Sequence, residues 1–427
     1  MKPKNKFQKQ IFELSKKLPP ITETQVKWAY LNCFEHFGFR TKKGVITCLE
    51  CGTSWKSEQI LIDSICGCSC LNCRIELKIK DTRKKTFRDY QYFCIITTFK
   101  GFQVLRFFYV SYEAKAGVEA KYFHSEVLQK WIAPDGKNVT VARLQIASYL
   151  GGNWNFKSNL EIRPNRNHHN IMPACIYPRQ RLIPEIKRSG YRRNFFKLTP
   201  FDLFHALLTE SKAETLLKAG QTPLLKYFTD SSSRNISDYW PSVKICIRNG
   251  YQITDASIWC DYINLLRFFE KDLHNAKYVC PIDLKAEHDR YVRKKREWQK
   301  QQDREKAKRK ALKDNERFTE LKSRFFGICF TDGLIHVRVL ESVDEIIQEG
   351  DVLKHCVFTN DYHLKPDSLI LSACIDNKRI ETIEVSLSKL KILQSRGVCN
   401  KNTEYHDVII ALVKKNIHLI RKRLKAA

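Results

Sequence analysis

The sequence predicts an α+β protein built from several domains, and three observations support this fold class. The chain has 427 residues, which is more than a single hydrophobic core usually supports. Hydrophobic residues make up 43% of the chain and aromatic residues 11%, enough to fill more than one core. Stretches rich in β-branched and aromatic residues alternate with stretches of helical periodicity.

Changes in composition divide the chain into five segments. In order, we expect an N-terminal helical segment, a cysteine-rich β module, a linker with a helical domain, a long charged basic helix, and a C-terminal α+β module with a small antiparallel sheet plus a helix. The boundaries of these segments are 1–45, 46–165, 166–284, 285–325 and 326–427.

Local patterns place individual elements within the first three segments. Runs of Ile, Phe, Tyr and Val predict strands at 91–98 and 102–111, and Gly101 between them predicts a hairpin turn. A threonine followed by proline is a typical helix start, so the apolar stripe behind it predicts a helix over 199–220. A second helix is expected over 255–270 because its apolar residues share one face.

The segment 285–324 differs in kind from the rest. It contains sixteen Lys or Arg and eight Asp or Glu residues, with no Gly or Pro, and so predicts one long helix. Two interpretations stay open: a solvated arm joining two domains, or a helix that follows nucleic-acid phosphates.

The last segment predicts strands followed by a helix. Turn residues separate five short β-type runs, which we expect at 328–330, 334–339, 368–375, 380–387 and 390–395. An amphipathic helix is expected over 404–424, ending in a basic tail.

The charge balance points to a polyanionic partner. The chain carries 75 Lys and Arg against 46 Asp and Glu, a formal net charge of +29. Such an excess attracts polyanions at long range, and nucleic acid, DNA above all, is the commonest such partner. A protein from an organism with a basic proteome would show the same balance. A membrane surface fits less well, because no basic stretch carries a clean apolar face.

The sequence also favours a cytoplasmic location without membrane insertion. Residues 1–17 are polar and basic, without the apolar core of a secretory signal, and no apolar run is as long as a membrane span. Sixteen cysteines in such a chain predict thiols and a metal site rather than disulfides.

Four of the cysteines form a metal-binding pattern. Cys48 and Cys51 make one C-x-x-C pair, and Cys70 and Cys73 make a second pair after eighteen intervening residues. Two such pairs are the signature of a tetrahedral four-thiolate zinc site, and Gly52 would relieve crowding in the first turn. A closed site has no open position for water, so we expect a structural zinc that makes 46–165 a zinc-stapled, zinc-ribbon-like β module.

Two further cysteines leave an alternative open. Cys68 could replace Cys70 as a ligand, or Cys66 and Cys68 could both be free thiols near the site.

The C-terminal segment gathers a second set of chemically able side chains. His355 and Cys356 stand side by side, Glu384 lies in a strand pattern, and Gln394 and Asn400 follow it. Alternation along the strand places Glu384 opposite the apolar face, so a sheet could bring it together with His355 and Gln394.

These residues define an enzymatic hypothesis. His355 could act as an acid or base, Cys356 as a nucleophile, and Glu384 as a carboxylate partner or metal ligand. Gln394 and Asn400 could bind a substrate through their amides. The alternative for each is a structural role, with His355 and Cys356 a hydrogen-bonded pair and the amides satisfying backbone groups.

The same residues resemble the PcfJ-like family, which is found on conjugative plasmids and integrated mobile elements of bacteria. The matching motifs are Glu349-Gly350, His355-Cys356-Val357, Thr382-Ile383-Glu384 and the run from Gln394 through Arg396-Gly397 to Asn400. The resemblance extends upstream over about 195–405, through Trp240, Trp259, Asp261-Tyr262, Cys280-Pro281 and His288-Asp289. Where the family often has two adjacent histidines before the cysteine, this chain has Lys354-His355, which puts in doubt any mechanism that needs both histidines.

The resemblance implies a mobile-element protein, but it supplies no established reaction and no catalytic residue. We therefore predict a zinc-containing, nucleic-acid-binding accessory factor in conjugative DNA transfer or plasmid maintenance, with conjugation or relaxosome proteins as partners. The alternative is an enzyme, either nucleic-acid-processing or a nucleotide-dependent transferase, with its site around His355 and Glu384.

Overall fold

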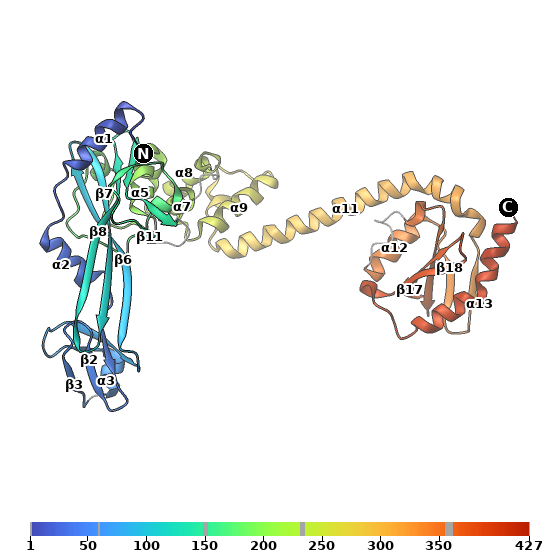
Figure 1. Ribbon diagram of the computed structural model, residues 1–427. Coiled ribbons are helices and arrows are strands. Elements are labelled where there is room, and N and C mark those ends of the chain that lie inside the picture. Colours follow the sequence, from blue (N-terminus) through green and yellow to red (C-terminus); the bar gives the residue numbers. More distant parts are fainter. Residues whose placement is uncertain (1, 59, 148–152, 231–234, 355–361, 427) are drawn as a thin grey trace. The chain divides into compact units, whose positions relative to one another are not determined.

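The computed structural model confirms the α+β class and divides the chain into two compact units (Figure 1). Unit 1 comprises Met1–His288 and unit 2 comprises Asp289–Ala427. The residues described are 2–58, 60–147, 153–230, 235–354 and 362–426.

Unit 1 is built on a six-stranded sheet with the strand order β12-β9-β8-β7-β6-β13. Its three central strands are long antiparallel neighbours, and the turn between β6 and β7 uses Lys100 and Gly101, both with positive φ. The hairpin expected at Gly101 is therefore confirmed. The strand bounds are β6 Thr86–Phe99, β7 Phe102–Lys115, β8 Val118–Ile132, β9 Asn138–Ala142, β12 Glu161–Arg163 and β13 Cys175–Ile176.

Two N-terminal helices, α1 (Lys6–Lys16) and α2 (Glu23–Asn32), pack against this sheet. Ile11 of α1 shares a core with Trp131, and Ala29 of α2 shares a core with Phe93. Burial of these apolar faces is the driving force that attaches both helices to the sheet.

A disulfide joins Cys33, just after α2, to Cys175 in β13. The expectation of thiols rather than disulfides is wrong at this pair. The two residues are 142 positions apart, and only the packing of α2 over the sheet brings them together.

The cysteine pairs belong to a second, five-stranded sheet with the order β3-β2-β1-β5-β4, so the span 46–165 contains strands of three sheets. Within this second sheet β1 and β5 are parallel neighbours, with Arg40 opposite Asp81. Its elements are β1 Phe37–Arg40, β2 Val45–Cys48, β3 Ser54–Lys56, α3 Ile60–Cys66, β4 Cys68–Ser69 and β5 Glu76–Asp81. The short strands β10 (Gln145–Ala147) and β11 (Asn153–Trp154) form a separate pair.

Short helices complete unit 1. The single helix expected over 199–220 is two helices, because Glu210 has an extended backbone (φ −122°, ψ 104°) that interrupts the pattern. The helix expected over 255–270 is observed, capped by Asp255. The helix bounds are α4 Pro184–Arg188, α5 Pro200–Thr209, α6 Ser211–Lys218, α7 Thr222–Thr229, α8 Trp240–Arg248, α9 Ala256–Phe268 and α10 Ala276–Val279.

The charged segment is one continuous helix, α11 (Leu284–Lys322), of 39 residues. In unit 2 its last turns join the fold: Phe318 lies in a core with Ile346, and the buried Lys322 donates hydrogen bonds to the carbonyl oxygens of Lys365 and Pro366.

Unit 2 is an antiparallel five-stranded sheet in sequential order, β14 to β18. One face packs on α13, where Ile383 and Val385 meet Ile409, and α12 packs on the sheet through Ile346 and Ile370. The C-terminal sheet plus helix is thus confirmed, with α12 as an addition. The bounds are β14 Cys329–Thr331, β15 His336–Val339, α12 Val343–Leu353, β16 Ser368–Ile375, β17 Lys378–Ser386, β18 Lys391–Arg396 and α13 His406–Lys425.

This packing predicts a sharp contrast between two neighbouring residues of α13. Ile409 is fully buried, whereas Val408 is 48% exposed. Ile409→Ala should lower the unfolding free energy of unit 2 by about 2–5 kcal/mol because it leaves a cavity. Val408→Ala should change it by less than about 0.5 kcal/mol. Hydrogen exchange of the amides in β16 and β17 measures both, and equal effects would contradict this account of the core.

Candidate metal centre and basic groove

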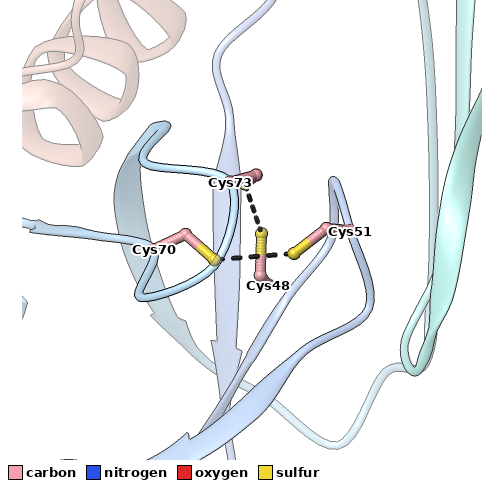
Figure 2. A group of neighbouring side chains, drawn as sticks. All are labelled: Cys48, Cys51, Cys70 and Cys73. Carbon is pink, nitrogen blue, oxygen red and sulfur yellow. Dashed lines mark hydrogen bonds between the residues drawn. The ribbon is translucent and has the colours of Figure 1, made fainter.

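Cys48, Cys51, Cys70 and Cys73 lie together as the sequence predicted (Figure 2). Their sulfur atoms all lie within 4.8 Å of one another. The Sγ atoms of Cys48 and Cys73 are 3.8 Å apart, and those of Cys51 and Cys70 are 3.5 Å apart. A tetrahedral site with metal–sulfur bonds of about 2.3 Å has sulfur–sulfur edges of about 3.8 Å. The four thiols are therefore spaced to hold a metal ion.

The two cysteine pairs have matching local geometry, because each is a tight turn. The backbone N–H of Glu50 donates to the sulfur of Cys48 at 3.3 Å, and that of Asn72 donates to the sulfur of Cys70 at 3.4 Å. Each turn ends on a residue with positive φ, Gly52 in the first and Arg74 in the second. Both turns thus direct two sulfurs to one point and stabilise them with backbone donors.

Gly52 also allows a close approach between the first turn and the turn that joins β7 to β8. A Cβ atom added at Gly52 would lie 2.7 Å from the carbonyl carbon of Gly117. No side chain fits at such a distance, so glycine is required both for the positive φ and for the contact.

The alternative ligand Cys68 is not part of the group. Among the described residues the cluster contains Cys70, while Cys66 is exposed and Cys68 is half-buried outside it. Cys68 belongs to β4, which pairs with β5, whereas Cys70 begins the turn between these two strands.

The four thiols have unlike environments. Burial raises the pKa of the Cys48 thiol well above its usual range. Burial also opposes ionisation of Cys51, but hydrogen bonds with Thr53 outweigh it and lower the pKa of Cys51 to about 6. A cation among the sulfurs would favour the thiolate form at every position, because thiolates are the ligands that metals bind.

A groove of about 1260 Å³ lies beside the metal centre, in the same sheet. Its walls include Val45, Thr47 and Ser54 of β2 and β3, the two strands joined by the turn of the first cysteine pair. Five exposed basic side chains line it, and none of them forms an ion pair within the described part of the chain: Lys42, Lys43, Arg83, Lys84 and Lys85. Arg40 and Asp81, which also line the groove, are paired with each other at 2.7 Å and cancel in charge.

Strand pairing explains why two distant basic runs meet in this groove. Residues 42–43 follow β1, and residues 83–85 follow β5. Because β1 and β5 are parallel, with Arg40 opposite Asp81, the chain leaves both strands at the same edge of the sheet. Sequence reasoning missed the groove. The available signal was a pair of short basic runs, 42–43 and 83–85, each directly after a β-type run.

In unit 2 the structure brings Glu384 and Gln394 together, as predicted. They are opposite one another in β17 and β18, and the Gln394 amide donates to Glu384 Oε2 at 2.8 Å. The other carboxylate oxygen accepts a hydrogen bond from Ser368 at 2.7 Å, and the Glu384 side chain is buried. Asn400 is exposed at the end of a short 3₁₀ helix, whereas His355 and Cys356 lie outside the described residues.

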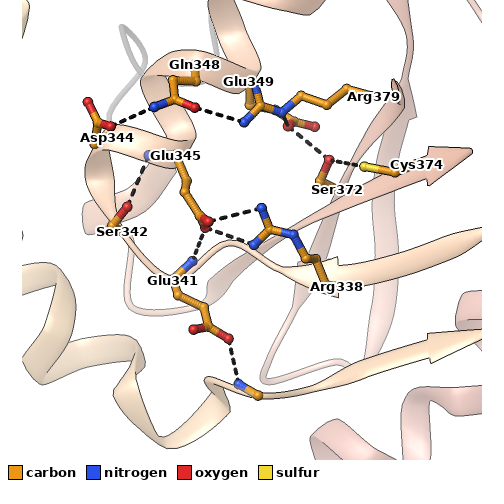
Figure 3. A network of polar contacts seen from close by, with 11 residues as sticks. Arg338, Glu341, Ser342, Asp344, Glu345, Gln348, Glu349, Ser372, Cys374 and Arg379 are labelled. Carbon is orange, nitrogen blue, oxygen red and sulfur yellow. Dashed lines mark hydrogen bonds and ion pairs between the residues drawn. The ribbon is translucent and has the colours of Figure 1, made fainter. Parts of the chain in front are cut away.

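A second buried carboxylate, Glu349 of α12, lies in a polar network between this helix and the sheet (Figure 3). Ser372 and Thr382 each donate to it at 2.9 Å, and Arg379 forms an ion pair with it at 2.9 Å. Burial raises the pKa of Glu349, because these partners only partly offset the loss of water.

Glu381 has a similar environment on the other face of β17. Ser395, Thr403 and His406 surround its buried carboxylate, and burial is outweighed by these hydrogen bonds, so the pKa of Glu381 is lowered. From the sequence, Glu381 was only a carboxylate distant from Glu384, and its partners were not identified. The three carboxylates of this module are thus held by side chains of the fold itself.

A family model described as PcfJ-like protein matches residues 258–410. This stretch of the chain belongs to the PcfJ-like family. The match begins later than the expected 195 and includes the C-terminal motifs quoted above. The metal centre and the groove lie outside it, in the N-terminal part of the chain. No curated protein and no solved structure matches the chain.

The buried carboxylates Glu349, Glu381 and Glu384 all belong to the PcfJ-like stretch. Glu349 and Glu384 are also the acidic residues of its motifs. Their hydrogen-bond and ion-pair partners come from β16, β17 and β18, so these motif positions join α12 and the neighbouring strands of the sheet. No helix among the described residues is long and apolar enough to cross a membrane.

The cluster predicts which cysteines a bound metal requires. Cys70→Ser should remove the metal, because it takes away one of four ligands, whereas Cys66→Ser should retain it, because this exposed thiol is outside the cluster. Metal content per purified chain, measured by plasma mass spectrometry, tests both variants. Loss of metal from Cys66→Ser, or its retention in Cys70→Ser, would contradict the ligand set.

Proposed function

We propose that this PcfJ-like protein is a zinc-containing, nucleic-acid-binding accessory factor that acts in the cytoplasm in conjugative DNA transfer or plasmid maintenance. The observation that carries the proposal is the groove beside the metal centre, with five basic side chains that have no ion-pair partner among the described residues. Phosphate groups are the ligands that such a surface attracts, and DNA presents them in a regular row.

Zinc is the metal that suits the four-cysteine group. Soft thiolate ligands in a tetrahedral arrangement favour zinc over hard cations such as magnesium or calcium. Four sulfurs fill its coordination, so the ion would have a structural role. It would fix the ends of β2 and β5, the strands that border the groove, and so preserve the spacing of the basic side chains.

The groove residues suit backbone recognition more than base reading. Lysine and arginine at the edge of a sheet make contacts with phosphates that carry no sequence information. Binding is therefore expected to show little sequence preference in the absence of partner proteins. The net charge of +29 adds a long-range attraction that brings nucleic acid to the surface.

The role in conjugation rests on the PcfJ-like stretch. The family occurs on conjugative plasmids and integrated mobile elements, so DNA and conjugation or relaxosome proteins are the partners that we propose. Unit 2 would then be the part of the chain that distinguishes this protein from other basic, zinc-containing DNA binders.

The groove predicts a specific change in the salt dependence of binding. A variant with Lys42, Lys43, Arg83, Lys84 and Lys85 replaced by Gln loses five charges that face the groove. The slope of log Kobs against log salt should decrease in magnitude by up to about 4, because each phosphate contact contributes about 0.7–0.9. Fluorescence anisotropy with labelled single-stranded and duplex DNA, from about 50 to 300 mM salt, measures the slope.

A matched control removes the same number of charges from the exposed face of α13, at Lys414, Lys415, Arg421, Arg423 and Lys425. Its slope should change less than that of the groove variant. An equal decrease of the slope in both variants would show that net charge alone, without the groove, accounts for binding. Negligible DNA affinity of the natural protein at low salt would overturn the proposal.

Glu384 separates the accessory function from the enzymatic alternative. Glu384→Ala leaves the amide of Gln394 and the hydroxyl of Ser368 without their acceptor, and should cost about 1–3 kcal/mol of stability. DNA affinity, measured below the unfolding temperature, should stay within about twofold, because the groove lies in the other unit. A loss of DNA affinity as large as that of the groove variant would place Glu384 in the DNA interface instead.

A further inference from the structure

We propose that unit 1 contains a second anion site, a small pocket that binds a phosphate monoester. The pocket has a volume of about 260 Å³ and lies beside β9, β10 and β12. Five basic residues line it, with no Asp or Glu among the lining residues: Arg143, Arg163, Arg166, His168 and His169. It shares no residue with the groove beside the metal centre.

Two of the arginines are held in place by the fold. The Arg143 guanidinium donates to the carbonyl oxygens of Glu126 and Phe156, both at 2.8 Å, and also to that of Ser158. Backbone oxygens fix the position of this group without cancelling its charge. Arg163 donates to the Ala142 carbonyl oxygen at 3.4 Å and forms a 3.4 Å ion pair with Glu161.

Of the other three residues, Arg166 and His168 are available for a ligand, whereas His169 is buried. Arg166 is exposed, and the described residues offer it no ion pair; His168 is half-buried. The rings of His168 and His169 are 4.1 Å apart between centroids. One exposed guanidinium and one half-buried imidazole thus stand at a pocket whose remaining arginines are already oriented.

The pocket also lies in the field of a buried lysine. Lys130 is 2% exposed and donates to Thr140 at 2.9 Å. Burial lowers the pKa of His168, and the charges of Arg166 and Lys130 lower it further. Burial is the largest cause that lowers the pKa of His169, the charge of His168 is the next, and this pKa falls to about 4.

Like charges gathered in this way repel one another, and the acids nearby are few. Glu161 pairs with Arg163, and Asp202 acts on Lys130, while its own carboxylate accepts hydrogen bonds from Asn170 and Thr199. An anion in the pocket would offset the repulsion and give the unpaired Arg166 a partner.

The size and charge of the pocket favour a phosphate monoester. A monoester carries about −1.5 to −2 charges at pH 7, and its oxygens match the planar fork of arginine. Typical small-molecule pockets span about 300–1,000 Å³, so this one suits a phosphate group rather than a whole nucleotide. The group could be the terminal phosphate of a nucleic-acid strand, a source that rests on the proposed function, or a free phosphate.

The test uses the full-length protein and the double variant Arg166→Gln, His168→Gln, with Arg192→Gln as a control. Arg192 is exposed and lies outside the pocket. Inorganic phosphate, titrated by calorimetry at constant ionic strength, should bind the natural protein and the control. The double variant should bind it at least about 10-fold more weakly, the factor expected for losing one charge-assisted hydrogen bond. Equal affinity in all three proteins would overturn the site, whether or not the protein binds DNA.

Oligonucleotides with a 5′-phosphate, a 3′-phosphate or no terminal phosphate then identify the source. A strand end as ligand predicts tighter binding of one phosphorylated oligonucleotide, a preference lost in the double variant and kept in the five-residue groove variant. Inorganic phosphate binding without any such preference would support the site and assign it to free phosphate. A preference that survives in the double variant would contradict the pocket as its cause.

Discussion

The convergence of four sulfur atoms is the constraint on which the cysteine-rich sheet of unit 1 depends. The buried cluster at the metal centre itself is small, and a core of that size contributes little stability. A single ion bound to the ligands of both turns would supply the stability that the small core lacks. Metal binding to such a site contributes its free energy to folding. The basic runs after β1 and β5 depend on this sheet for their separation, because the parallel pairing of those strands brings them to one edge.

Unit 2 is organised by a different principle. Its buried carboxylates would each be costly if left without partners, and each is surrounded by hydroxyl, amide or guanidinium donors from neighbouring elements. Such networks specify one register of the sheet, because a shift by a single residue would move Glu384 to the apolar face occupied by Ile383. Motif residues in this stretch can therefore reflect the demands of folding, even where their chemistry resembles that of an active site.

Much of this architecture could be predicted from local patterns. The hairpin at Gly101, the long charged helix and the pairing of Glu384 with Gln394 follow from turn residues, composition and alternation, which are all properties of neighbouring residues. The two cysteine pairs were recognisable because each is a local turn with a fixed spacing. The failures lie where distant segments meet. The disulfide of Cys33 and the groove depend on tertiary packing, which no window of sequence contains. The break at Glu210 interrupts a continuous helical pattern and has no signal in that pattern.

The contact between Gly52 and Gly117 couples two features that the sequence keeps far apart. The first cysteine turn fits against the β7–β8 turn with no room for a side chain, and Gly117 also lines the groove. A ligand that displaces the β7–β8 turn would therefore strain the cysteine turn, and an ion that tightens the cysteine turn would restrict the β7–β8 turn. By thermodynamic reciprocity, occupancy of the groove and affinity for the metal would then be linked quantities, so metal availability would affect how firmly the groove holds a ligand.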